Sequence, residues 1–257
     1  MTGEPTTTAW KSGAAVLEHT EPYRIRFDEA GPDGLVRTSG LLRYAQDAGW
    51  QHSEARGLTR GWYAERGVAW VVRAAEIEVR EAAPMGTTLS VTTRIVGYQR
   101  VWAQRRAECR LPDGRIAARI RTDWVLIDGR GRLVRVPPEI TQRFPAPLLS
   151  EPLLRVVLPP TPDTSHRRSF TVRPHELDPM NHPNNAVYVD WVEEGLLGSG
   201  REGGSVVATR PRTVRLDYAG APPPGAEVTS ATWPSGDAWA TRLGIGESDL
   251  LRATVHG

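Results

Sequence analysis

The side chains best suited to chemistry gather in one stretch, residues 176–188, which reads ELDPMNHPNNAVY. One aspartate, one histidine and three asparagines occupy eight positions directly before a predicted helix: Asp178, Asn181, His182, Asn184 and Asn185. A carboxylate can act as a nucleophile or as a base toward water, an imidazole can move protons near neutral pH, and an amide can orient either group. Because Asp and Asn also populate turns and cap helices, a purely structural turn is the alternative interpretation.

The elements around this stretch occur twice in the same order. Alternation of Tyr23, Ile25 and Phe27 predicts a strand that starts near Tyr23, and a helix capped by Thr38 or Ser39 runs on to Gly57. Period-two patterns then predict strands over residues 68–80, 87–96, 102–111 and 116–127. The second run has a strand over 170–173, a helix over 185–197, and strands over 212–218, 226–233, 238–245 and 250–255.

An internal repeat accounts for this order. A shift of about 147 residues pairs Arg26 with Arg173, Glu29 with Glu176, Pro32 with Pro179 and Tyr44 with Trp191, and a second anchor pairs Pro84-Met85-Gly86 with Pro223-Pro224-Gly225. We therefore divide the chain into a disordered leader (1–20), an N-terminal unit (21–136), a proline-rich linker (137–165) and a C-terminal unit (166–257). Each unit would leave a sheet edge unpaired, so we expect the two sheets to join side by side.

The stretch 176–188 resembles the Asp-x-x-x-His-x-Asn-Asn-x-x-Tyr signature of hotdog thioesterases, especially plant and bacterial acyl-ACP thioesterases. The first copy is similar to the N-terminal hotdog of that family in the segments FDE (27–29), LLRYAQDA (41–48), WVVR (70–73) and TDWVLID (122–128). The resemblance runs from about residue 21 to 220. It implies an α+β tandem double hotdog, in which two long helices are each wrapped by an antiparallel sheet.

The resemblance also implies hydrolysis of fatty or polyketide-type acyl thioesters of acyl carrier protein or CoA, in fatty acid or polyketide biosynthesis, without a metal or organic cofactor. Asp178 would be the nucleophile or general base, His182 its proton partner, and Asn184 and Asn181 the orienting amides. Peptide N–H groups at the start of the second long helix would polarise the thioester carbonyl. Substrate contacts are expected from Asn185, Tyr188, Met180, Glu193, Trp50 and Trp70.

The first copy has lost the polar trio of the second, because the shift places Gly31, Leu35 and Arg37 opposite Asp178, His182 and Asn184. We expect the first copy to be a scaffold that forms the acyl pocket.

Two departures from the family pattern keep other functions open. The family usually carries an Asn two residues after the Asp, where this chain has Met180, and a Glu or Cys on the following strand, where it has Ala221 and Pro222. Asn181 is a candidate substitute for the amide, and the candidate carboxylates are Glu193, Glu194, Asp190 and Asp217. The alternative interpretation of these carboxylates is an acidic, solvated helix face. The alternatives are a non-hydrolytic hotdog enzyme (dehydratase, isomerase or cyclase) acting on a carrier-bound intermediate of secondary metabolism, and a catalytically inactive acyl-binding protein.

Composition excludes several other classes of protein. The 32 Lys and Arg are interspersed with 30 Asp and Glu for a net charge of +2, which argues against nucleic-acid binding. The single cysteine, Cys109, excludes an intramolecular disulfide, and no metal-ligand spacing is recognisable. Residues 200–204 lack the ending of a phosphate-binding loop and predict a flexible loop. Without an apolar span or signal segment we expect a cytoplasmic protein away from membranes, and the sequence is compatible with a homodimer.

Overall fold

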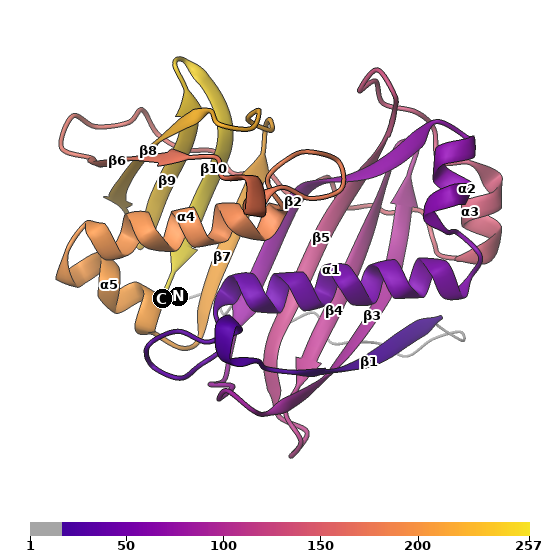
Figure 1. The fold of residues 1–257 in the computed structure, drawn as a ribbon, viewed down its shortest axis with the longest axis horizontal. Coiled ribbons are helices and arrows are strands. Elements are labelled where there is room, and N and C mark those ends of the chain that lie inside the picture. Colours follow the sequence, from indigo (N-terminus) through magenta and orange to yellow (C-terminus); the bar gives the residue numbers. More distant parts are fainter. Residues whose placement is uncertain (1–16) are drawn as a thin grey trace, which may run out of the picture.

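The computed structural model describes residues 17–257, in which two α+β units share one sheet (Figure 1). The first unit contains β1 (Glu18–Arg24), the 3-10 helix η1 (Phe27–Glu29), α1 (Thr38–Ala55), α2 (Arg60–Glu65), β2 (Val68–Val79), β3 (Thr88–Gln99), β4 (Trp102–Arg110) and β5 (Ile116–Asp128). Helix α3 (Pro138–Arg143) follows. The second unit contains β6 (His166–Thr171), the 3-10 helix η2 (Pro174–Glu176), α4 (Asn185–Gly198), α5 (Arg201–Ala208), β7 (Arg212–Tyr218), β8 (Glu227–Ser235), β9 (Ala238–Ile245) and β10 (Ser248–His256).

The ten strands form one antiparallel sheet in the order β1-β3-β4-β5-β2-β7-β10-β9-β8-β6. At its centre β2 pairs with β7, with Ala74 opposite Asp217 and Ile77 opposite Val214. Read outward from this pair, the two halves have equivalent orders, β2-β5-β4-β3-β1 and β7-β10-β9-β8-β6. The predicted tandem double hotdog, with its two sheets joined side by side, is therefore confirmed.

Helices α1 and α4 pack on the same face of this sheet and contact each other (Figure 1). Helix α1 buries Leu41, Leu42, Ala45 and Ala48, which recur at the three- and four-residue spacing that places side chains on one helix face. The helix-facing strand residues alternate, as with Val214 and Leu216 of β7. Burial of a Leu or Val side chain contributes roughly 1.5–3 kcal/mol, so this layer supplies much of the stability of the fold.

The repeat extends to the loops. Ala30 bridges Val36 before α1, and Leu177 bridges Pro183 before α4, each pair 147 positions from its counterpart. At the second anchor Gly86 donates its N–H to the carbonyl of Ile25 (2.9 Å), and Gly225 donates to that of Val172 (3.0 Å). Both glycines adopt a positive φ, which makes glycine the favoured residue there. The loops of the two copies are therefore structurally equivalent at these positions.

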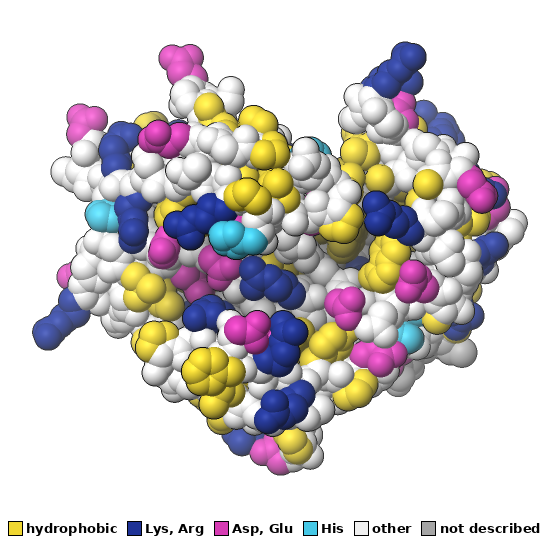
Figure 2. Space-filling view, in the orientation of Figure 1, with side chains coloured by type: hydrophobic (Ala, Val, Ile, Leu, Met, Phe, Trp, Pro, Cys, Tyr) yellow, Lys and Arg dark blue, Asp and Glu magenta, His cyan; other side chains and the backbone are white. Residues whose placement is uncertain are grey.

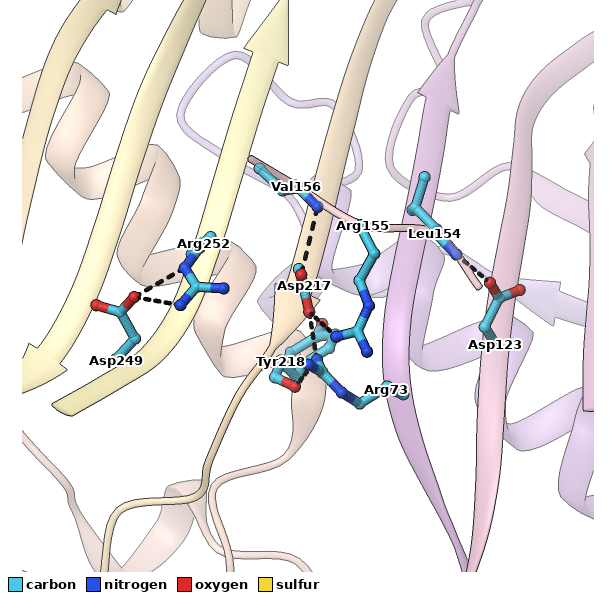
Figure 3. Close-up of polar contacts among 9 residues, drawn as sticks. All are labelled: Arg73, Asp123, Leu154, Arg155, Val156, Asp217, Tyr218, Asp249 and Arg252. Carbon is cyan, nitrogen blue, oxygen red and sulfur yellow. Dashed lines mark hydrogen bonds and ion pairs between the residues drawn. The ribbon is translucent and has the colours of Figure 1, made fainter. Parts of the chain in front are cut away.

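A strap, residues 152–158 of the proline-rich segment, crosses the opposite face of the sheet (Figure 3). The Leu154 N–H donates to the carboxylate of Asp123 on β5 (2.8 Å), and the Val156 N–H donates to Asp217 on β7 (3.3 Å). Asp217 also forms ion pairs with Arg73 of β2 and, at 3.6 Å, with Arg155 of the strap. The strap is thereby bonded to both halves of the sheet through two carboxylates that are almost fully buried.

Two strands start four or more residues before their predicted positions. Strand β1 starts at Glu18 and not near Tyr23, because Glu18 already pairs with Arg94 of β3. Residues 18–20 of the predicted leader thus belong to a strand, while residues 1–16 lie outside the described residues. Strand β6 begins at His166, four residues before the predicted position, because it pairs with β8 from there.

The predicted cap of the first long helix and the predicted loop over 200–204 were both wrong. Neither Thr38 nor Ser39 caps α1: the N-cap is Arg37, and the Thr38 hydroxyl donates to Glu193 on α4. The predicted flexible loop over 200–204 instead enters helix α5. Gly203 lets α5 approach α4 closely, since a Cβ at this position would lie 2.3 Å from the Leu196 carbonyl oxygen. None of the helices formed by residues 17–257 is long and apolar enough to cross a membrane.

Candidate active site

The predicted catalytic residues lie in a closed turn, residues 177–184, between η2 and α4. The Asp178 N–H donates to the carbonyl of His182 (2.8 Å), and the Asn181 N–H donates to the carbonyl of Asp178 (2.9 Å). Asn181 completes the turn with a φ of 62°, the one non-glycine residue in the described part of the chain with a positive φ. Asn tolerates this left-handed conformation better than most residues. The turn holds Asp178 and His182 at its two ends, next to each other.

The carboxylate of Asp178 is oriented by the backbone of its own turn. Its Oδ1 accepts hydrogen bonds from the N–H of Met180 (2.8 Å) and, more weakly, of His182 (3.4 Å). Oδ2 has no hydrogen-bond donor among residues 17–257, so it is available to a ligand or to water. Asp178 therefore presents one fixed and one uncommitted oxygen.

The other side chains of the turn point outward. Asn181 and His182 are exposed, and the Met180 side chain is 42% exposed. The structure thus brings Asp178, Met180, Asn181 and His182 together at the surface of one turn. An exposed histidine can exchange protons with solvent, which suits a residue that transfers them.

Asn184 is the N-cap of α4, so one of its functions is structural. Its Oδ1 accepts the N–H of Ala186 (3.0 Å), and its own N–H donates to the carbonyl of Glu176 (2.9 Å). Of the peptide N–H groups predicted to polarise the thioester carbonyl, that of Ala186 is therefore already bonded. The N–H of Asn185 has no acceptor within the described chain and remains available at the positive end of the helix dipole.

Two buried tyrosines, Tyr188 of α4 and Tyr218 of β7, hold the start of α4 in place through their hydroxyl groups. The Tyr188 hydroxyl donates to the carbonyl of Gly220 (3.2 Å), and the Tyr218 hydroxyl donates to the carbonyl of Asn185 (3.0 Å). Burial, and after it the charge of Asp178, raises the pKa of Tyr188. Burial also raises the pKa of Tyr218. Both phenols therefore stay protonated and donate: Tyr218 holds the Asn185 peptide, and Tyr188 ties α4 to the loop after β7. Tyr218 was not among the predicted site residues; its position in the alternating strand β7, facing the helix, was the signal that pointed to it.

Glu193 lies away from the turn. Its carboxylate accepts from Thr38 and pairs with Arg212 (3.2 Å), and Arg212 also donates to Thr38 (2.6 Å). Eight residues of helix, about 12 Å, separate Glu193 from Asn185. The structure therefore groups Glu193 with α1 and β7, at the end of α4 remote from Asp178.

The same region forms a charged groove of about 500 Å³ beside the first-copy loop. Its lining includes Arg26, Glu29, Arg37, Arg43 and Asp190. Figure 2 shows dark-blue and magenta side chains crowded together in the middle of one face of the molecule. In the groove, Arg43 and Asp190 form an ion pair (3.1 Å). Of the three first-copy residues that replace the polar trio, Arg37 lines this groove, and no histidine of the described chain lines it.

The remaining candidates are dispersed. Trp50 on α1 is 40% exposed, whereas Trp70 on β2 is partly buried against a cluster that includes Leu58, Tyr63 and Phe144. Asp217 faces the strap side of the sheet, away from both helices and from the turn (Figure 3). Ala221 and Pro222 lie in the loop between β7 and β8.

No cluster of three or more His, Cys, Asp or Glu suited to a metal ion exists among residues 17–257. Cys109 is fully buried, and burial raises the pKa of its thiol to about 12. A thiol of this kind is a packing residue and not a nucleophile.

Two models of known protein families match this chain. The model of the acyl-ACP thioesterase N-terminal domain matches residues 17–144, and the model of the acyl-ACP thioesterase C-terminal domain matches residues 160–237. Together the two matches cover most of the chain.

Individual relatives are more distant. A chloroplastic acyl-[acyl-carrier-protein] hydrolase of Cuphea viscosissima is 25% identical over 197 residues, which are 69% of this chain and 47% of the relative. A chloroplastic palmitoyl-acyl carrier protein thioesterase of Cuphea hookeriana is 24% identical over 198 residues, 69% of this chain and 46% of the relative. The chain thus spans about half the length of the curated relatives it matches.

Two solved structures share the fold over nearly the whole chain. A putative oleoyl thioesterase from Lactobacillus plantarum superposes with a TM-score of 0.83 at 23% identity and 95% coverage of both chains. The 12:0-ACP thioesterase from Umbellularia californica superposes with a TM-score of 0.79 at 24% identity, covering 95% of this chain and 98% of that one.

Proposed function

Since this chain belongs to the acyl-ACP thioesterase family, we propose that it hydrolyses the thioester of a fatty acyl group carried by acyl carrier protein, at the turn formed by residues 177–184. The observation that carries this proposal is the hydrogen bonding of the Asp178 carboxylate. Its Oδ1 is fixed by two backbone N–H groups while Oδ2 is uncommitted, and His182 stands at the other end of the same turn. This arrangement presents a base and a proton carrier to one substrate carbonyl.

In the proposed reaction, Asp178 draws a proton from a water molecule as the water oxygen bonds to the thioester carbonyl carbon. The carbonyl oxygen gains negative charge, and the free N–H of Asn185 at the start of α4 stabilises it. The C–S bond then breaks, and the proton that Asp178 took from the water passes through His182 to the leaving sulfur. The products are a carboxylic acid and the free thiol of the carrier, and attack by Asp178 itself would give the same products through an acyl-enzyme.

The side chains of Asn181 and Asn184 are proposed to orient the water or the thioester. The free amide nitrogen of each can donate while the Oδ1 of Asn184 keeps the helix capped. Met180, Tyr188 and Asn185 would contact the substrate around the carbonyl, with Trp50 and Trp70 along the acyl chain. Glu193 is engaged with Arg212, so we assign it to the first-copy groove and to the contact between the helices.

The first copy is proposed to be the scaffold that holds the acyl chain, because it keeps the sheet and helix but lacks the aspartate and histidine. Thioesters of CoA and polyketide-type acyl groups contain the same reactive bond, and the turn can act on them by the same steps. The cytoplasmic location and the homodimer stay predictions from the sequence.

Measurement of thiol release tests the proposal. Medium and long acyl-ACP and acyl-CoA thioesters would be incubated with wild-type protein and with His182→Ala, and both the free thiol and the acyl product would be quantified. Release of thiol and free acid together, reduced by about 100-fold or more in His182→Ala, is expected for a lost proton carrier. A change in the acyl group without thiol release would favour the dehydratase, isomerase or cyclase hypothesis, and binding without any conversion would favour an acyl-binding protein.

A further inference from the structure

The core of the first copy contains a buried arginine that has no acidic partner. Arg105 on β4 is 7% exposed and faces α1. Its hydrogen bonds go to neutral groups, the Nδ1 of His52 on α1 (3.1 Å) and the hydroxyl of Thr93 on β3 (3.3 Å). No carboxylate of the described chain lies within ion-pair distance of it. Burying a charge without a counter-charge is costly, so an uncompensated guanidinium calls for a ligand.

Its neighbours are also unsatisfied. His52 is 2% exposed and Tyr98 on β3 is 3% exposed, yet neither His52 Nε2 nor the Tyr98 hydroxyl has a hydrogen-bond partner within residues 17–257. The side chains of Tyr98 and Arg105 lie close enough to interact electrostatically. Native proteins rarely leave buried polar atoms unpaired, and here two of them adjoin the unpaired charge.

The chemistry of these groups specifies what would satisfy them. A guanidinium only donates, so His52 Nδ1 must accept from Arg105, and the proton of the neutral ring then sits on Nε2. Burial, followed by the charge of Arg105, lowers the pKa of His52 to about 3, which keeps the ring neutral. Arg105, His52 Nε2–H and the Tyr98 hydroxyl are therefore three donors with one net positive charge. The complementary group is an acceptor with one negative charge, a carboxylate.

The sheet register places this donor set within reach of the thioester. Tyr218, which holds the Asn185 peptide, ends β7, and Leu216, two residues earlier on the same strand, is opposite Ala75 of β2. Ala75 is opposite Thr122 of β5, and Thr122 is opposite Arg105 of β4. Arg105 therefore lies three strand spacings, about 14 Å, from β7. An acyl chain that enters between α1 and the sheet from the turn would thus point its far end toward Arg105.

We propose that this donor set, formed by Arg105, His52 and Tyr98, binds a carboxylate at the far end of the acyl chain, so that the preferred substrate is a thioester of an ω-carboxyacyl group. The assignment rests on the proposed function for the position of the thioester, but the donor set itself does not. Gly49 supports it, because a Cβ there would lie 3.1 Å from the Arg105 side chain, so the absence of a side chain on α1 leaves room for the guanidinium.

The test compares two acyl-ACP series of matched chain length, one ending in a methyl group and one in a carboxylate. At the best-fitting chain length, the kcat/KM of wild type should be about tenfold or more higher for the carboxylate-ended substrate than for the methyl-ended one. This ratio is expected because the methyl-ended substrate lacks one hydrogen bond between charged groups. Arg105→Met should abolish or reverse this ratio, and Tyr98→Phe should reduce it. Arg100→Met, at the exposed turn after β3, is the matched control and should keep the wild-type ratio.

A binding assay separates failure of this proposal from failure of the proposed function. Calorimetry would measure the dissociation constants of a linear dicarboxylate and of the monocarboxylate of equal length, each with wild type and with Arg105→Met. Tighter binding of the dicarboxylate that is lost in Arg105→Met supports the donor set even if no thioester is cleaved. Equal binding of both acids, or thiol release with a methyl-ended preference that Arg105→Met leaves unchanged, would overturn it.

Discussion

Asn181 and Gly34 occupy the same left-handed turn position, 147 residues apart, with φ values of 62° and 73°. Each donates its N–H to the carbonyl of the residue three positions earlier, Asp178 or Gly31, at 2.9 Å. The two copies have therefore kept one backbone turn and changed its side chains. The chemistry proposed for the second copy would therefore use a backbone turn that the first copy also forms, without the aspartate and histidine.

The equivalence of Asn181 and Gly34 separates the backbone role of Asn181 from its side-chain role. Asn181→Gly should leave the free energy of unfolding near that of wild type, because glycine adopts this φ at no steric cost. Asn181→Val should lose roughly 1–2 kcal/mol. If the amide orients water or thioester, Asn181→Gly should lower kcat by about tenfold, and an unchanged kcat would remove Asn181 from the site.

Asn184 caps α4, so its loss should affect stability as well as activity. Asn184→Ala should cost about 1 kcal/mol in urea unfolding, and Asn184→Asp should restore most of it because Asp is an equally good cap. The Asp variant keeps an acceptor but loses the amide donor. We therefore expect kcat to stay low in both variants; full activity in Asn184→Asp would show that only the cap matters.

The carboxylate of Asp217 should be structural. It is 1% exposed and joins the strap to β2 and β7 on the sheet face opposite the turn. Asp217→Asn should lower the free energy of unfolding by about 2 kcal/mol, less than for a fully buried pair because Arg73 and Arg155 are partly exposed. At a temperature where the variant stays folded its kcat should equal that of wild type, and a selective loss of kcat would refute this assignment.

His52 makes stability dependent on pH. Its pKa is lowered from 6.5 to about 3 by burial and by Arg105. Between these values the unfolded chain binds a proton that the folded chain does not, so the free energy of unfolding falls as pH drops below about 6.5. The loss should reach about 2 kcal/mol near pH 5. His52→Gln should flatten that part of the stability curve; a curve unchanged by the substitution would contradict the burial of a neutral His52.

Much of the architecture was predictable because it depends on local patterns. Alternation in β7 and helical spacing in α1 identify buried faces without knowledge of the partner. The pairs Arg26 with Arg173 and Glu29 with Glu176 could be aligned because each Arg–Glu pair brackets the same 3-10 turn. The family resemblance was confirmed for the same reason: its motifs lie in these local turns.

The failures concern contacts between distant segments. Thr38 is an ordinary N-cap residue in the sequence, but Glu193, 155 positions later, takes its hydroxyl. Asp217 was a candidate carboxylate of the site in the sequence, but in the fold Arg73 and the strap lie beside it and bond to it. The glycines of α5 suggested a loop because nothing in the local sequence shows that Gly203 packs on Leu196. The donor set around Arg105 could not be foreseen either, since its members come from α1, β3 and β4.

The most direct test of the central claim compares Asp178→Asn with Asp33→Asn in single-turnover thiol release from acyl-ACP. Both aspartates accept a backbone N–H within equivalent turns, Asp178 from Met180 and Asp33 from Leu35 (3.0 Å). We predict that Asp178→Asn lowers the rate by about 100-fold or more, as for loss of a general base or nucleophile, while Asp33→Asn keeps the wild-type rate. Wild-type release by Asp178→Asn, or equal losses in both variants, would contradict hydrolysis at the second-copy turn.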